Sequence, residues 1–119
     1  MSDVPSEISN FFLAMQAGRS ATATMEKLFA EDATYEEPFS GKMTTHTGRA
    51  AILKAMDAGW QQPLPDMHLS IERVAATTDA IVVDWVCYSP ALPGGAGRGR
   101  NTFVLKDGKI VSLKTAFQT

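Results

Sequence analysis

Residues 98–117 read RGRNTFVLKDGKIVSLKTAF, and they carry the clearest structural signal in the chain. The dipeptide Asp107-Gly108 favours the tight turn of a two-residue β-hairpin, because both residue types tolerate a positive φ. Apolar and β-branched residues flank this turn on both sides. The stretch therefore predicts two antiparallel strands, over residues 98–106 and 109–117.

The two-residue loop also decides which side chains share a face. It pairs Phe103 with Ser112, and this register leaves Phe117 on the face opposite Phe103. Either Phe103 and Phe117 do not both face the interior, or the last strand carries a β-bulge, whose one extra residue shifts the alternation by one position. We favour a bulge near Val111 and Ser112. It would turn the apolar residues of the last strand inward together, namely Ile110, Leu113 and Phe117.

Two more strands are predicted before this hairpin, over residues 67–76 and 80–88, and the segment SPALPGGAG predicts a loop over residues 89–97. Both faces of the second strand are largely apolar, with Val83 and Trp85 on one face and Val82 and Val86 on the other. Helices cover only one face of such a sheet, so the outer face also needs cover. We therefore expect a homodimer formed through the outer sheet face.

The first half of the chain predicts three helices. Apolar residues recur at helical spacing over residues 6–18, a second helix spans residues 20–31, and a third follows Thr47 as its cap. A short strand over residues 33–37 and a polar loop over residues 40–47 separate the last two. The expected fold is one α+β domain over residues 1–119. Three helices cover one face of a curved antiparallel sheet, which is made of the short strand and a four-strand meander.

Composition argues against several classes of partner. The chain has 119 residues, a net charge of −2 and a pI near 5.6, so it lacks the basic surface that nucleic acids or anionic membranes require. No segment is long and apolar enough for a membrane span, and no signal peptide is recognised, so we expect a cytoplasmic location. His46, His68 and Cys87 do not have the spacing of metal ligands, and we expect neither a metal nor a cofactor.

The candidate chemistry lies in residues 29–39, FAEDATYEEPF. Adjacent residues of a strand point to opposite faces, so Glu36 and Glu37 do not form a carboxylate pair. Glu37 shares its face with Tyr35, and an acid among apolar neighbours is a candidate for proton transfer. The residues leave alternatives open: Glu37 binds a polar group of a ligand, or it pairs with Lys42 or Arg49.

Four strings occur in an order and spacing that resemble a known superfamily: FAEDATYEEP, TGRAAI, PDMHLSIERV and FVLKDGKIVSL. They resemble the nuclear transport factor 2-like domains, and among these the SnoaL-like polyketide cyclase and ketosteroid isomerase branch. The resemblance covers nearly the whole chain. It implies a cone-shaped, curved antiparallel sheet with three helices packed on its concave face, which together enclose an apolar pocket, commonly in a dimer.

The resemblance also implies roles for individual residues. Ketosteroid isomerases place a carboxylate base before a proline on the first short strand, and this position falls on Glu37. Of their two donors to the enolate oxygen, the aspartic acid falls on Asn101 and the tyrosine falls on Phe11. Losing one such donor typically costs about 100- to 1,000-fold in rate. The site is therefore expected to stabilise an enolate oxygen less strongly than the site of the isomerases.

The resemblance places a set of apolar and aromatic residues around the ligand: Phe11, Met15, Tyr35, Phe39, Met56, Trp60, Val83, Trp85, Cys87, Phe103 and Phe117. The expected ligand is a small apolar molecule, a steroid-like or polyketide-like carbonyl compound. The implied function is an isomerase that shifts a proton α to a carbonyl, with Glu37 as general base and Asn101 steadying the enolate. The alternative is a non-catalytic ligand-binding or dimerisation module of the same fold.

Overall fold

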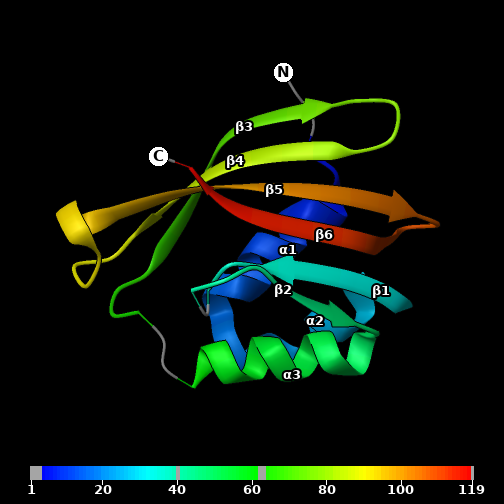
Figure 1. Cartoon of the computed structure of the whole chain (residues 1–119), viewed down its shortest axis with the longest axis horizontal. Coiled ribbons are helices and arrows are strands. Elements are labelled where there is room, and N and C mark those ends of the chain that lie inside the picture. Colours follow the sequence, from blue (N-terminus) through cyan, green and yellow to red (C-terminus); the bar gives the residue numbers. More distant parts are fainter. Residues whose placement is uncertain (1–3, 40, 62–63, 119) are drawn as a thin grey trace.

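One six-stranded curved sheet, with helices against one of its faces, forms the framework of the protein (Figure 1). The computed structural model describes residues 4–39, 41–61 and 64–118. The predicted α+β class and the packing of helices on one face are confirmed. The sheet is open, with β2 and β3 at its two edges.

The elements follow one another in the order shown in Figure 1. The helical first half contains α1 (Ser6–Ala17), the 3-10 helix η1 (Gly18–Ala21) and α2 (Thr22–Leu28), then β1 (Phe29–Glu37), β2 (Thr44–Thr47) and α3 (Arg49–Trp60). The second half contains β3 (His68–Ala76), β4 (Ile81–Tyr88), the 3-10 helix η2 (Pro93–Gly95), β5 (Ala96–Lys106) and β6 (Lys109–Gln118).

The sheet has the strand order β2-β1-β6-β5-β4-β3. The meander β3 to β6 is antiparallel throughout, as predicted, and Asp107 and Gly108 turn the last hairpin with φ values of 53° and 78°. β1 pairs with β6 in parallel, which the predicted antiparallel sheet did not include. This pairing places the first strand of the chain beside the last.

Three boundaries differ from the prediction. The second helix ends at Leu28, so β1 begins at Phe29 and not at residue 33. The loop predicted over residues 40–47 contains strand β2, which pairs with the end of β1. Its residue Ser40 lies outside the described residues. Gly48, with a φ of 92°, occupies the N-cap of α3, and the predicted cap Thr47 belongs to β2.

The predicted bulge is present in β6. Val104 pairs with Ser112 and Leu105 with Ile110, which leaves Val111 as the extra residue. Ile110 and Leu113 are buried, at 0% and 1% exposure. Phe117 lies on the same face as Phe103 and Leu113, as predicted, but it is 59% exposed, so the expectation that it is enclosed is wrong. The reason is that β6 extends beyond the core that the helices cover.

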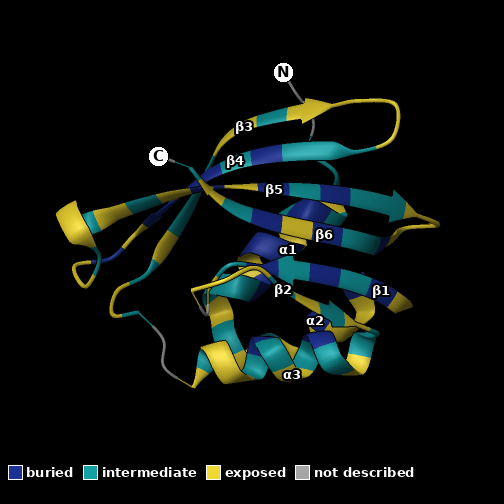
Figure 2. Cartoon of the chain, in the orientation of Figure 1, coloured by how far each residue is buried: buried dark blue, intermediate teal, exposed yellow. Residues whose placement is uncertain are grey.

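Aromatic rings fill the space between the helices and the sheet. Phe11 and Phe12 of α1 make edge contacts with Phe103 of β5, at centroid distances of 5.3 and 6.2 Å. Phe29 meets Phe11 from the start of β1. Figure 2 shows that buried residues concentrate on the inner side of α1 and on the central strands. The candidate site lies on the concave face of the sheet, next to this core.

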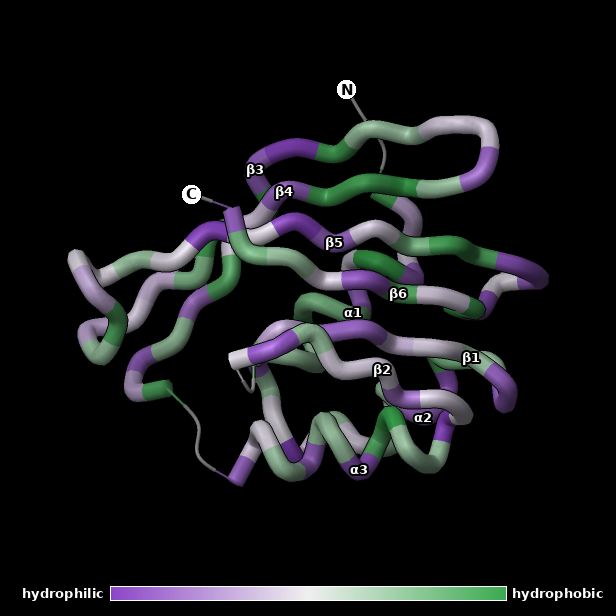
Figure 3. Tube along the Cα trace, in the orientation of Figure 1, coloured by the Kyte–Doolittle hydropathy of each residue, from purple (hydrophilic) through white to green (hydrophobic). Residues whose placement is uncertain are grey.

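No helix of the described residues covers the convex face of the sheet. Val82 and Val86 of β4 point to this face, Val82 partly exposed and Val86 only 1% exposed, and Figure 3 shows most of β4 in hydrophobic colours. Asp84 lies between them and binds Arg100, with 2.7 Å between Oδ1 and Nε. The hydrogen bond from Arg100 lowers the pKa of the Asp84 carboxyl. The convex face thus combines valines with an internal ion pair.

Within the described ranges, no helix is long and apolar enough to cross a membrane.

Candidate functional site

A row of polar side chains crosses the concave face of the sheet. The parallel register of β1 and β6 brings Glu37 beside Thr115. Thr115 pairs with Asn101 of β5, and Asn101 pairs with Val83 of β4. Glu37, Thr115 and Asn101 are all buried, although each is polar. Buried polar groups are costly unless they are hydrogen-bonded, so this row calls for an explanation.

Apolar residues border the polar row on both sides. Towards the helices, the neighbouring row contains Tyr35, Leu113 and Phe103, all at most 3% exposed. Away from the helices, the next row contains Phe117, Gly99 and Trp85. The polar groups therefore lie between a row of buried core residues and a row that contains aromatic side chains.

Glu37 has both carboxylate oxygens held by hydrogen bonds. The backbone N–H of Phe39 donates to Oε1 over 2.8 Å, and Nε2 of His46 lies 2.8 Å from Oε2. The Glu37 side chain is only 12% exposed. The predicted partners Lys42 and Arg49 do not form an ion pair with Glu37 among the contacts found in the described residues.

The sequence placed His46 in the loop over residues 40–47 and outside the candidate site, whereas the structure places it on β2. It lies on β2 directly opposite Tyr35, so its side chain shares the concave face. Its ring packs against the Tyr35 ring at a centroid distance of 5.9 Å. The available signal was the β-branched run of Thr44, Thr45 and Thr47 around it, which favours a strand over a loop.

Tyr35 is buried and remains neutral over the physiological pH range. Burial raises the pKa of its hydroxyl, and the nearby negative charge of Glu37 raises this pKa further, against the opposing effect of a hydrogen bond with Thr115. Thr115 donates its hydroxyl proton to Asn101 Oδ1 over 2.8 Å.

Asn101 has a fixed amide orientation. Its Oδ1 accepts from Trp85 Nε1 over 3.0 Å and from Thr115 Oγ1 over 2.8 Å. The indole N–H can only donate, so the atom that faces it must be the amide oxygen. Among the described residues, no side-chain polar atom is both sealed from solvent and without a partner. Since Nδ2 of Asn101 takes part in none of the hydrogen bonds found, its two N–H groups must face accessible space.

Trp85 reaches Asn101 by lying across a glycine. It pairs with Gly99 on β5, and a Cβ atom at this position would overlap the Trp85 atoms Cζ2, Cε2 and Cη2. Only glycine lets the indole lie flat on the neighbouring strand. The Trp85 side of the site is therefore determined by the backbone of β5.

The predicted ligand-lining residues fall into three groups. Seven are buried: Phe11, Tyr35, Met56, Val83, Trp85, Cys87 and Phe103. Met15 and Trp60 are partly buried and pack against the same core. Phe39 and Phe117 are exposed, at 53% and 59%, and touch each other with a centroid distance of 5.5 Å. Phe39 follows Glu37 by two residues, so this aromatic pair lies at the edge of the polar row.

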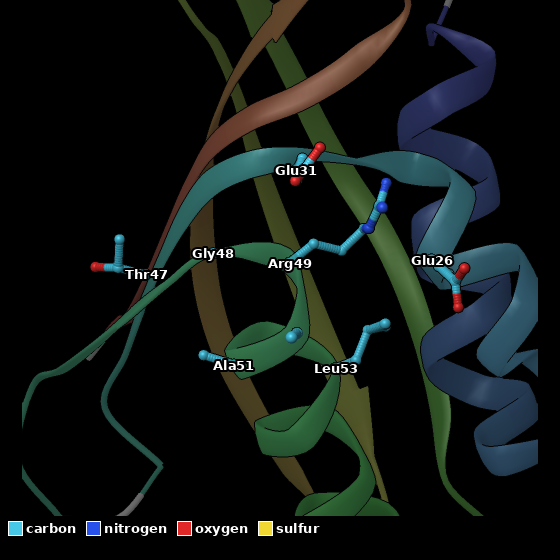
Figure 4. Close-up of a pocket in the computed structure, with 8 residues that line it drawn as sticks. Glu26, Glu31, Thr47, Gly48, Arg49, Ala51 and Leu53 are labelled. Carbon is cyan, nitrogen blue, oxygen red and sulfur yellow. The ribbon is translucent and has the colours of Figure 1, made fainter.

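Two hollows lie elsewhere on the surface. One, of about 470 Å³, is lined by β2, the start of α3, and residues Glu26 and Glu31; Figure 4 shows Arg49 extending between these two carboxylates. The other, of about 410 Å³, lies between α1 and the edge strand β3. Neither hollow is lined by Glu37 or Asn101. In the described part of the chain, no cluster of three or more His, Cys, Asp or Glu side chains could hold a metal ion.

Comparisons with known proteins agree with this architecture. The sequence profile of the SnoaL-like domain matches residues 8–113. A proposed polyketide cyclase from Sinorhizobium meliloti superposes with a TM-score of 0.79 at 23% identity, over 96% of each chain. A proposed ketosteroid isomerase from Kribbella flavida has a TM-score of 0.74 at 20% identity, over 97% of this chain and 77% of the other.

A third similar structure is a protein of ketosteroid isomerase-like fold from Catenulispora acidiphila in complex with trimethylamine. Its TM-score is 0.74 at 20% identity, over 98% of this chain and 88% of the other. Likenesses at these identities establish the fold and not the chemistry. No protein of curated function matches the chain in sequence.

The contact between Trp85 and Gly99 predicts a strong effect of Gly99→Ala. The added methyl group displaces the indole and breaks its hydrogen bond to Asn101, and overpacking of this kind costs about 1–3 kcal/mol. The free energy of unfolding in urea measures the loss. Gly97→Ala is the matched control on the same strand, because its nearest atom, Leu92 Cδ1, lies at an ordinary 3.7 Å. Equal losses in the two variants would contradict the close packing of Trp85.

The burial of Tyr35 predicts a stability loss at alkaline pH. Above the ordinary tyrosine pKa of 10.0 the unfolded chain releases this proton while the folded protein keeps it. The unfolded state then binds fewer protons, so stability falls as pH rises, by about 1.4 kcal/mol per pH unit. Urea unfolding between pH 9 and 11 measures the slope, with Tyr35→Phe as reference. Identical slopes in both proteins would show that Tyr35 is not the responsible group.

Proposed function

The chain belongs to the SnoaL-like domain family, and from the geometry of its site we propose that it is an isomerase acting on a small apolar carbonyl compound. Glu37 is the general base and Asn101 is the donor to the substrate oxygen. The observation that carries the proposal is the pairing of a buried carboxylate with an amide whose N–H groups are unpartnered, two strands apart on one concave face.

The spacing suits a substrate that spans both groups. Neighbouring strands lie about 4.8 Å apart, so Glu37 and Asn101 stand about 10 Å apart at the backbone, with Thr115 between them. In the proposed pose both side chains extend from the concave face, and the carbonyl oxygen of the substrate lies at Asn101 Nδ2. The adjacent carbon then lies toward Glu37. A steroid-like or polyketide-like ketone has this arrangement of acidic C–H group and oxygen.

The proposed reaction needs no external oxidant or reductant. Glu37 takes a proton from the carbon α to the carbonyl, and the electron pair of that C–H bond moves into an enolate. The Asn101 N–H groups stabilise the negative oxygen, which is a stronger acceptor in the enolate than in the ketone. Glu37 then returns the proton to another carbon of the enolate, and the double bond has moved.

A second candidate is a non-catalytic module that binds an apolar ligand. Two observations favour it. Phe11, where the isomerases carry a tyrosine donor, has no hydroxyl and packs into the aromatic core. The exposed Phe39 and Phe117 next to a carboxylate also suit an alkylammonium group, which aromatic faces attract. The similar protein that holds trimethylamine makes this amine a useful probe.

The base role predicts that Glu37→Gln abolishes turnover. A 3-oxo-Δ5-steroid is the probe, and the absorbance of the conjugated ketone product measures its isomerisation. Removing a general base lowers kcat by about 100- to 10,000-fold. Glu36→Gln is the matched control, because Glu36 is the adjacent acid on the opposite face of β1 and leaves kcat unchanged. Equal turnover by Glu37→Gln and the unaltered protein would exclude the base role. Binding of the steroid or trimethylamine without turnover would favour the binding module.

We propose a homodimer through the convex face, because no helix of the described residues packs on it and Val82 is partly exposed there, although Val86 is already buried. Val82→Arg introduces a charge at the centre of this face, and we expect it to convert a dimer into a monomer. Sedimentation velocity at micromolar concentration measures the change. Leu13→Arg is the control, since Leu13 is 62% exposed on α1, away from the sheet face. A monomeric unaltered protein, or dissociation by both variants alike, would contradict this interface.

A further inference from the structure

The hairpin of β1 and β2 brings His46 to the Glu37 carboxylate. Tyr35 pairs with His46 and Glu37 pairs with Thr44, so Glu37 and His46 are diagonal neighbours on the same face. Diagonal neighbours are within reach of long or aromatic side chains, and Nε2 of His46 lies 2.8 Å from Oε2 of Glu37. The contact is a consequence of strand register and of the identity of residue 46.

The direction of this hydrogen bond follows from the chemistry of the partners. An ionised carboxylate can only accept, so the proton lies on Nε2 whenever Glu37 is ionised. The Tyr35 ring beside the imidazole and the low exposure of its side chain, 22%, restrict where the ring can turn. His46 therefore presents one N–H group in a fixed direction.

The carboxylate needs such a fixed donor because its last torsion is soft. Rotation about the terminal bond of a glutamate has a broad, roughly two-fold profile and no sharp staggered wells. Without His46, the hydrogen bond from the Phe39 N–H to Oε1 would leave the carboxylate free to pivot about that contact. A second donor on Oε2 fixes the plane of the carboxylate. Each oxygen keeps a further lone pair for a substrate proton.

We propose that His46 is a positioning residue that fixes the carboxylate plane of Glu37 toward the concave face. The proposal rests on the base role of Glu37. Proton transfer requires the base and the C–H group to be aligned, and a displacement of about 1 Å can cost about 100-fold in rate. His46 acts through Glu37 and has no contact with the substrate in this role.

The experiment measures kcat and KM for the 3-oxo-Δ5-steroid in His46→Ala and His46→Gln. We expect His46→Ala to lower kcat by about 10- to 100-fold with little change in KM, because the ligand-binding groups stay in place. His46→Gln restores most of kcat, since its amide N–H replaces the donor. His68→Ala is the matched control: His68 is exposed on the opposite edge strand, where it stacks on Tyr88, and its loss leaves both constants unchanged.

The combination with Glu37→Gln separates positioning from a general structural effect. In that background His46→Ala is expected to cause no further loss, because the two residues act as a unit. A wild-type kcat in His46→Ala would overturn the positioning role while leaving the base role intact. So would a failure of His46→Gln to restore kcat when its thermal midpoint matches that of the unaltered protein. Undiminished turnover in Glu37→Gln alone would instead overturn the base role, and the positioning role with it.

Discussion

The parallel pairing of β1 with β6 is the constraint on which the site depends. It places Glu37 next to Thr115, and the antiparallel hairpin of β5 and β6 then places Asn101 on the other side of Thr115. Glu37 and Asn101, which are 64 positions apart along the chain, thus lie in one row of the sheet. The bulge at Val111 is part of the same constraint, because it sets the phase of β6 beyond the turn. Without that extra residue, Thr115 would point to the convex face and the polar row would be interrupted.

The polar row is tolerated in an apolar setting because almost every group in it has a partner. A buried polar atom left without a hydrogen bond costs about 1–3 kcal/mol, so an unsatisfied row of this length would threaten a domain of this size. Glu37 has two donors, the Thr115 hydroxyl donates to Asn101, and Asn101 Oδ1 has two donors. The N–H groups of Asn101 are the exception. In the proposed function a ligand oxygen is their partner.

The fold followed from local signals in the sequence, whereas the site depended on pairings that local signals do not specify. The Asp107-Gly108 turn and the strand alternation could be predicted because each depends on neighbours in sequence, whereas the bulge was inferred from the expectation that Phe103 and Phe117 share a face. β2 was missed because four residues after a proline and a glycine form too short a strand to show a period. With β2 went His46. Phe117 was placed inside because alternation gives the face of a residue, and gives no information about where the helices stop covering it. The positions of Glu37 and Asn101 came from the resemblance; their roles remain proposals.

The hydrogen bonds that Asn101 Oδ1 accepts affect how strongly the Asn101 N–H groups can donate to a ligand oxygen. Thr115 and Trp85 both donate to the Asn101 Oδ1 atom. Hydrogen bonds to Oδ1 draw electron density from the amide and make its N–H groups better donors. Cooperative strengthening in such chains is about 10–30% per bond. This polarisation favours ligands that carry negative charge on oxygen over those that carry a neutral carbonyl, which is the preference that an enolate-forming site requires.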